Sequence, residues 1–549
     1  MAKRKSEIFR LSDEYSEKMA KDDYLGATEN NIHDYDHMLN DYSFAESDPL
    51  LRIARAYKKK INAEEPIDYY DEIAKKVILK ELDVHIEIAS DIWHYTDWGS
   101  VYSDPDAIYL VFDKMPKETK EDISKIIKRL EKVPTAINEW ASSIFKAAEY
   151  GYFNAKLRVE YVIDMLQNIC SNSRFSKFAQ SIDPNNKRLM KAALQADTAY
   201  RMLVGYLKEY RDEVATEGFH VEKEKYIQLV RHYTGLTVDP REVYEWGIKE
   251  LDRINAEMWE VGKRIDDKAT KLTDFSKALN NDSKYKIHGK ENFKNFLENI
   301  TNTAIKDLNG VIFDIPKTAR NCRVELDEDT IDESPYYLGP SDDLVRPAKT
   351  SYPTLGRDVF STWENYSTWF HESVPGHHMQ IVTAILNKNT LTRFQRNDAW
   401  NSGYGEGWAL YSEKLMDELG YFEDPGYKMG YLLCQAMRAA RLIVDVGLHL
   451  QYTAPSGKIW GIDEAVKLME ERALLNHDYA VSEVKRYISW AGQAISYKLG
   501  ERIWIESRED AKEKFGPTFN LRKFHMYALK LGPMGLDILK EELAKWDGK

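Results

Sequence analysis

The segment Phe370–Gln380 brings together residue types that could bind a metal ion and activate water. It reads Phe-His-Glu-Ser-Val-Pro-Gly-His-His-Met-Gln. In an H-E-x-x-H motif, two histidines one helical turn apart bind zinc and the intervening Glu acts as general base. Here the fourth residue after His371 is Pro375, whose side chain has no donor atom for a metal. A second ligand would therefore have to lie further on, at His377 or His378.

The backbone between these histidines must depart from a regular helix if two of them are to share an ion. On an ideal helix His377 would lie about 120° around the axis from His371 and about 9 Å along it, too far for both rings to reach one ion. Pro375 disrupts helical hydrogen bonds, and Gly376 accepts almost any backbone angle. A looped-out Val-Pro-Gly would bring His377 back under His371. The alternatives are His378 as the ligand after a larger compression, or a proline-kinked helix that binds no metal.

A glutamate further along the chain could supply a third ligand. Glu406 follows His377 by 29 residues (406 − 377) and stands between Gly405 and Gly407. In sites made of two His and one Glu, the carboxylate comes from the next helix, and glycines beside it allow a close approach of the backbone. The alternative is an acidic first-turn residue that favours the helix dipole. Glu413, seven residues on and on the same face, is either a rival ligand or a carboxylate that orients one.

Four motifs in this order resemble the family called "domain of unknown function 885", which is grouped with the gluzincin metallopeptidases. The motifs are H-E-x-x-P-G-H-H-x-Q at 371–380, G-E-G-W-A-x-Y at 405–411, R-L-I-V-D-x-G-L-H at 441–449 and R-Y-x-x-W-x-G-Q-A-x-x-Y-K-x-G at 486–500. The resemblance extends over most of the chain, including Ala27-Thr28 and Tyr35-Asp36. One residue departs from the pattern: Ala491 stands where the family usually has Pro before Gly-Gln-Ala.

The resemblance implies a mainly α-helical, gluzincin-like metallopeptidase that uses zinc, although another divalent ion would suit the same ligands. Gly376-His377 also looks like the Gly-His that ends the zinc helix in helical carboxypeptidases and oligopeptidases, which favours His377 over His378. The expected metal ligands are then His371, His377 and Glu406.

Candidates for substrate contact lie in the two later motifs. Arg441, Asp445 and His449 recur every four residues on an otherwise apolar helix, so they form one polar stripe that either lines a cleft or faces solvent. Tyr497 or His449 could stabilise an oxyanion, and Arg486 could hold a substrate carboxylate. The expected substrate-binding residues are Arg441, Arg486, Tyr487 and Gln493.

Glu372 would act as the general base beside these ligands. Zinc lowers the pKa of its water, and Glu372 would take the proton and pass it to the leaving amine. We therefore expect a zinc-dependent hydrolase of amide bonds in short peptides. The alternatives are hydrolysis of a non-peptide amide or acylated metabolite, and a metal-binding protein without catalysis, which has no need of Glu372.

Composition restricts the partners and the location. The chain has 549 residues, a net charge of -13 and no long basic run, which argues against nucleic acid as a partner. No apolar run of about 18 residues exists to span a membrane, and the first ten residues lack the apolar core of a secretory signal. The three cysteines show no metal or redox spacing. These features predict a cytoplasmic protein with reduced thiols and no membrane partner; they do not indicate an oligomeric state.

The elements that must position these residues are mostly helices. We expect residues 1–235 to be helical and to form one wall or lid of the cleft, and residues 236–549 to hold the catalytic region. A small β element is expected between Ile312 and Tyr352, directly before the metal motif, and helices again after Asp358. The clearest helices are Asp71–Ile92, Glu118–Lys132 and Arg188–Thr216, and the clearest strands are Arg323–Leu326 and Ser334–Leu338.

Overall fold

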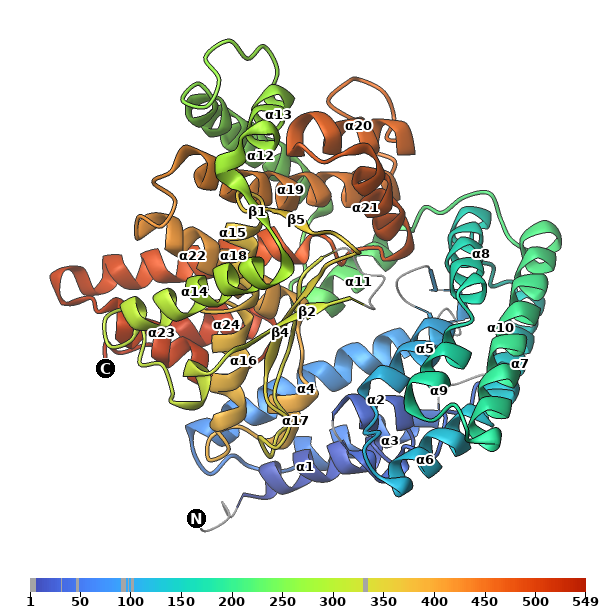
Figure 1. Cartoon of the computed structure of the whole chain (residues 1–549). Coiled ribbons are helices and arrows are strands. Elements are labelled where there is room, and N and C mark those ends of the chain that lie inside the picture. Colours follow the sequence, from blue (N-terminus) through green and yellow to red (C-terminus); the bar gives the residue numbers. More distant parts are fainter. Residues whose placement is uncertain are drawn as a thin grey trace. The chain divides into compact units, whose positions relative to one another are not determined.

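The computed structural model describes residues 6–30, 32–45, 49–89, 95–96, 98–99, 103–328 and 334–549, and it is mainly helical, as predicted (Figure 1). The chain divides into two compact units. The first consists of Met1–Val221 together with Lys485–Trp490, and the second of Glu222–Val484 together with Ala491–Lys549. The division differs from the expected boundary near residue 235, because the first unit ends earlier and also takes a short segment from far along the chain.

The first unit is built from helices. The predicted helix Asp71–Ile92 corresponds to α4, and residues 90–92 lie outside the described residues. Thr119 and Asp122 form a reciprocal capping box at the start of α6, which explains why this helix begins slightly later than expected. The elements are α1 Glu7–Met19, α2 Tyr24–Glu29, η1 His33–Tyr35, α3 Pro49–Asn62, α4 Tyr69–Ala89, α5 Asp104–Lys114, α6 Lys120–Leu130, α7 Val133–Glu149, α8 Lys156–Ser171, α9 Arg174–Ile182 and α10 Lys187–Glu213.

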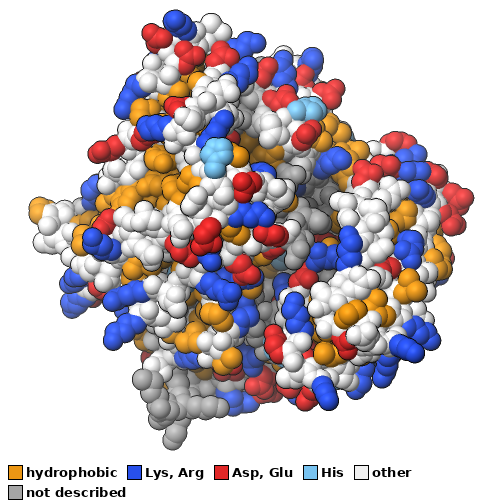
Figure 2. Space-filling view, viewed as in Figure 1, with side chains coloured by type: hydrophobic (Ala, Val, Ile, Leu, Met, Phe, Trp, Pro, Cys, Tyr) orange, Lys and Arg blue, Asp and Glu red, His pale blue; other side chains and the backbone are white. Residues whose placement is uncertain are grey.

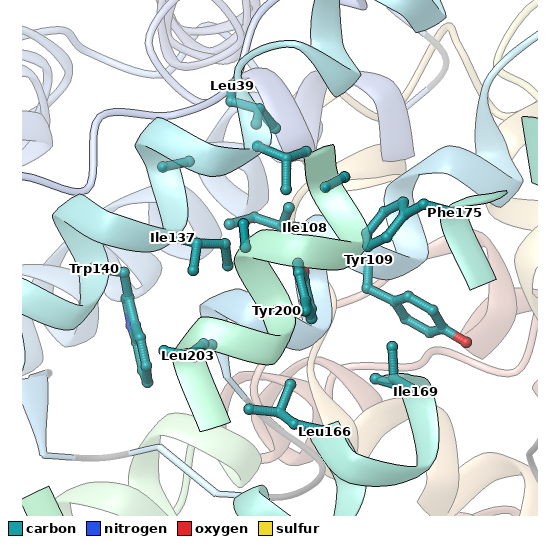
Figure 3. Close-up of a cluster of buried hydrophobic side chains, with 14 of the residues drawn as sticks. Leu39, Ile108, Tyr109, Ile137, Trp140, Leu166, Ile169, Phe175, Tyr200 and Leu203 are labelled. Carbon is teal, nitrogen blue, oxygen red and sulfur yellow. The ribbon is translucent and has the colours of Figure 1, made fainter. Parts of the chain in front are cut away.

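The core of the first unit forms around one face of α10. Its buried apolar residues recur at alternating intervals of four and three, which keeps them on one side of the helix. They include Ala196, Tyr200, Leu203 and Leu207. Figure 3 shows Tyr200 and Leu203 within this cluster, and the Tyr200 and Phe175 ring centroids are 5.1 Å apart. Each large apolar side chain buried in this way stabilises the unit by roughly 1.5 to 3 kcal/mol.

The second unit holds the remaining helices and both small sheets. Its helices are α11 Lys223–Thr234, α12 Pro240–Gly262, α13 Leu272–Asn281, η3 Ser283–Tyr285, α14 Lys290–Leu308, η4 Thr318–Arg320, α15 Asn365–Glu372, α16 His377–Leu386, α17 Arg393–Asn397, α18 Ser402–Glu418, α19 Pro425–His449, α20 Ile462–Ala473, α21 His477–Ser489, α22 Ser496–Phe515, η5 Gly516–Thr518, α23 Leu521–Lys530 and α24 Leu536–Ala544. The last residues of α21 belong to the first unit.

Strands are a minor ingredient, and three of them lie where the sequence predicts. In the order β2-β4-β3, β4 pairs parallel with β2 and antiparallel with β3. A separate antiparallel pair joins β1 to β5. That pair corrects two expectations, since β1 precedes Ile312 and β5 follows Asp358. The strands are β1 Lys286–His288, β2 Arg323–Asp327, β3 Tyr336–Leu338, β4 Lys349–Pro353 and β5 Val359–Ser361.

Glycines allow α18 and α22 to touch backbone to backbone. A Cβ added to Gly407 would lie 2.4 Å from the Cα of Gly500, and one added to Gly500 would lie 2.1 Å from the main-chain oxygen of Gly403. Only glycine fits at such a crossing. The first turns of α18, which carry Glu406, are therefore held closely against α22 (Figure 1).

On the face drawn in Figure 2, basic and acidic side chains are interspersed over the surface. Among the described residues, no helix is both long enough and apolar enough to cross a lipid bilayer.

Candidate metal centre

The helix that carries the first histidine stops after Glu372, and a new helix begins at His377. The turn between them contains a cis peptide bond, Val374–Pro375. It folds tightly on the end of α15, because a Cβ added to Gly376 would lie only 1.9 Å from the main-chain oxygen of His371. The chain therefore makes a sharp break where the proline and glycine predict a looped-out segment.

The break brings two imidazoles and one carboxylate together. His371, His377 and Glu406 each offer one ligand atom, and these atoms all lie within 4.8 Å of one another. The Nε2 atom of His371 is 3.2 Å from Oε2 of Glu406, and the Nε2 atom of His377 is 3.6 Å from the same oxygen. Both histidines are buried.

His378 points to other partners. Its Nδ1 atom is 3.1 Å from the hydroxyl oxygen of Tyr337, and its Nε2 atom is 3.0 Å from the main-chain oxygen of Ala319. Burial lowers the pKa of His378 to about 4, so the ring is neutral. Of the two adjacent histidines, His377 is the one that faces Glu406.

Glu413 orients His371 from behind. Its Oε1 atom lies 2.9 Å from Nδ1 of His371, and its Oε2 atom accepts a 2.5 Å hydrogen bond from the hydroxyl of Ser367. A carboxylate on Nδ1 holds the proton there and leaves Nε2 free to act as a ligand. Between the two roles that the sequence allows for Glu413, this geometry matches the orienting one.

The ligand set fits a divalent ion. A tetrahedral zinc ion with ligand distances of about 2.1 Å holds its ligand atoms about 3.4 Å apart. The two spacings to Glu406, 3.2 and 3.6 Å, lie on either side of that value. A simple hydrogen-bonded pair of His371 and Glu406 would not explain why His377 faces the same carboxylate. The 3.6 Å between Nε2 of His377 and Oε2 of Glu406 is too long for a hydrogen bond. Unlike Nδ1 of His371, the Nδ1 atom of His377 has no hydrogen-bond partner in the described part of the chain.

The charges in this buried cluster also favour a bound cation. Burial opposes the charged form of His371, but contacts with Glu406 and Glu413 outweigh it and raise its pKa to about 10. Burial would also raise the pKa of Glu406, yet its contacts with His371 and His377 hold that pKa well below the usual value. A cation is therefore strongly favoured between these groups, whether it is a proton or a metal ion.

Glu372 is buried beside the cluster. Burial raises its pKa, while the nearby His371 and His377 act in the opposite direction. Arg438 of α19 also lowers the pKa of Glu372 and that of Glu413, so its positive charge is felt at this site. Arg438 is not among the site residues predicted from the sequence, although it stands three residues before Arg441 on the same helix.

An exposed tryptophan lies next to the second histidine. The ring centroids of Trp400 and His377 are 6.0 Å apart, and Trp400 keeps 46% of its surface exposed. It packs on Gly405, where an added Cβ would lie 2.2 Å from the Trp400 ring. Trp400 was not predicted as part of the site either. The sequence has 13 tryptophans, and nothing in it shows which of them lies beside the histidines.

The polar stripe of α19 is buried and has internal partners. Arg441 makes a 2.7 Å ion pair with Glu483. Asp445 accepts hydrogen bonds from the hydroxyl of Tyr226 and, at 3.0 Å, from the main-chain nitrogen of Gly492. Burial raises the pKa of Asp445 to about 7 despite these bonds. The stripe therefore does not face solvent as an Asp–Arg pair.

The other expected substrate contacts divide between the two units. His449, Gln493 and Tyr497 are buried in the second unit. The Nε2 atom of His449 is 3.9 Å from Oδ1 of Asp445. Arg486 and Tyr487 fall in the segment that belongs to the first unit.

Comparisons with known proteins give a family and a fold. Residues 23–543 match the family described as "Bacterial protein of unknown function (DUF885)". A candidate lipoprotein from Colwellia psychrerythraea is similar in structure, with a TM-score of 0.85, 21% identity and 99% of each chain covered. A candidate lipoprotein of unknown function from Shewanella oneidensis has a TM-score of 0.77 and 17% identity, over 98% of this chain and 100% of its own. No curated protein matches the chain.

Proposed function

Because the chain belongs to the DUF885 family, whose description names no activity, we propose a function from the geometry of its candidate metal centre: a zinc-dependent hydrolase of amide bonds in short peptides. One observation carries the proposal. The ligand atoms of His371, His377 and Glu406 lie within 4.8 Å of one another, and Glu372 is buried beside them. A site that only binds metal needs no such extra carboxylate.

The chain's own residues would divide the work as follows. His371, His377 and Glu406 would hold the ion, which when bound supplies an activated water and polarises a carbonyl group. Glu413 keeps His371 in the tautomer that binds. Glu372 would accept a proton from water and return it to the leaving nitrogen.

The likeness to gluzincin peptidases is part of this proposal and rests on the broken H-E motif and the glutamate of the following helix. Helical peptidases of that kind suggest short peptides as substrates, an argument from analogy of fold. A cytoplasmic location stays a prediction, and both solved relatives are described as candidate lipoproteins. Cell fractionation tests it.

The decisive experiment combines metal analysis with Glu372→Gln. We expect the purified wild type to bind one zinc ion and to cleave members of a peptide library read by mass spectrometry. Glu372→Gln should bind the same amount of zinc and lose about two to four orders of magnitude in kcat, because it keeps the shape and removes the base.

Glu364→Gln is the matched control, since Glu364 lies at the opposite end of α15. It should retain both metal and turnover. Unchanged kcat in Glu372→Gln would remove Glu372 as the base, and a wild type that takes up no zinc after supplementation would remove the whole site.

A further inference from the structure

Helices α15 and α19 lie side by side and run in the same direction. A Cβ added to Gly430 would lie 1.8 Å from the main-chain oxygen of Trp363, so α19 touches the chain two residues before α15 begins. One turn further along α19, the thiol of Cys434 is 3.4 Å from the hydroxyl of Thr368. The next turn of α19 carries Arg438, and the next turn of α15 ends at Glu372. The register of the two helices therefore places Arg438 at the level of Glu372.

The electrostatics agree with this register. Burial raises the pKa of Glu372, and the positive charge of Arg438 opposes that rise. Arg438 likewise helps to lower the pKa of Glu413 against the effect of burial. The guanidinium thus lies within electrostatic range of both carboxylates around the metal cluster.

Arg438 lacks the partner that a guanidinium in such a place normally has. Within the part of the chain that the structure describes, it forms no ion pair with a carboxylate, and its buried Nε has no hydrogen-bond partner. Its neighbours are sulfur atoms, with Nη1 3.7 Å from Sδ of Met437 and the thiol of Cys434 also in contact. Sulfur is a weak acceptor, so within the described residues this side chain has no strong acceptor.

Arg441, one turn further on, provides the contrast. Its Nη2 is bound to Glu483 at 2.7 Å, so its charge is already neutralised. The guanidinium carbons of Arg441 and Arg438 lie 4.5 and 5.9 Å from the ring centroid of Tyr497. Both guanidinium groups therefore lie near the Tyr497 ring, and of the two, only Arg438 has no carboxylate partner among the described residues.

We propose that Arg438 binds the C-terminal carboxylate of the substrate, so that this site acts on the free C-terminal end of short peptides. The inference rests on the proposed function. A guanidinium fork matches a carboxylate in a bidentate geometry. It also overcomes the repulsion that Glu372 and Glu413 would exert on a second negative group. From the sequence, the same role was predicted for Arg486.

The test compares one acetylated hexapeptide library in two forms, with a free C-terminus and with a C-terminal amide. The wild type should cleave the free form with a kcat/KM about tenfold to a hundredfold higher, near the C-terminal end, as expected for a charged bidentate hydrogen bond. In Arg438→Ala this ratio should fall to about one, mainly through a higher KM for the free form.

A purely structural role for Arg438 would lower the activity on both forms in parallel and would leave the ratio unchanged, which contradicts the inference. Equal cleavage of both forms by the wild type also contradicts it. If Arg438→Ala is not folded, as judged by circular dichroism and zinc content, Arg438→Gln keeps the length of the side chain and is tested in the same way.

Calorimetric binding separates this inference from the proposed function. The zinc-loaded Glu372→Gln protein should bind acetyl-trialanine about tenfold or more tightly than its amide, and adding Arg438→Ala should abolish the difference. If this pattern appears without turnover in the wild type, hydrolysis is wrong and the carboxylate site stands. If both peptides bind equally, or neither binds, the assignment of Arg438 is wrong.

Discussion

The two ring nitrogens of His371 have separate tasks. One faces Glu413 at 2.9 Å and the other faces Glu406 at 3.2 Å. The sequence predicts the three ligand candidates from their types and spacing. Types and spacing alone do not decide between His377 and His378, and the preference for His377 comes from the Gly-His resemblance. Consecutive residues of one helix differ by about 100° in direction, so the preceding turn sets which one faces inward.

Glu413→Gln tests the orienting role at the residue scale. The amide keeps the volume but loses the charge that holds the Nδ1 proton of His371. We expect zinc affinity to fall by about tenfold to a hundredfold while all three ligands remain. Titration against a chromogenic chelator measures the dissociation constant.

Ser367→Ala is the graded comparison for that variant. It removes the hydroxyl that donates to Glu413 and leaves the bond between Glu413 and His371 in place. Its effect on zinc affinity should be clearly smaller. Wild-type affinity in Glu413→Gln would show that the carboxylate does not support the ligand.

Arg438 shows what residue types alone do not reveal. It stands in the run Met-Arg-Ala-Ala-Arg, where nothing in the residue types distinguishes Arg438 from Arg441. Its importance comes from the register of α19 against α15 and from the absence of an ion pair in the described residues, and both are properties of packing. Neither the helix register nor the missing ion pair can be deduced from a sequence pattern.

At the scale of elements, the break between α15 and α16 is the feature that the sequence predicts best. Pro375 and Gly376 end one helix and allow the next to start, each for a local backbone reason. Strands β1 and β5 could not be predicted in the same way. Each has three residues, too few for an alternating pattern, and each exists because the other pairs with it.

Gly376→Ala tests the break. The new methyl group would lie 1.9 Å from the main-chain oxygen of His371, and a backbone atom cannot move aside as a side chain can. We expect a loss of about 2 kcal/mol or more in the free energy of unfolding, together with weaker zinc binding. Chemical denaturation and chelator competition measure the two effects.

Gly205→Ala is the control for the same substitution. Gly205 lies in α10 with nothing within 4 Å of an added Cβ. This variant should be stabilised by about 1 kcal/mol, because alanine favours a helix interior. Wild-type stability and zinc affinity in Gly376→Ala would mean that the turn relaxes without disturbing His371.

At the scale of the whole molecule, every candidate ligand belongs to the second unit. A bound ion stabilises the folded state of the region that holds it. Added zinc should therefore slow hydrogen exchange in α15, α16 and α18 and leave α7 and α10 of the first unit unchanged. Mass spectrometry of peptide fragments measures the exchange. Protection confined to the first unit would place the ion elsewhere.

The short segment Lys485–Trp490 ties the first unit to a distant part of the chain. The buried Arg158 donates from Nε to the main-chain oxygen of Ile488 at 2.8 Å, and an added Cβ on Gly99 would lie 2.3 Å from Ser489. The partner of Arg158 is 330 residues further along. On the ribosome, the first unit therefore cannot complete its packing as soon as its own helices emerge. It has to wait until nearly the entire polypeptide has been synthesised.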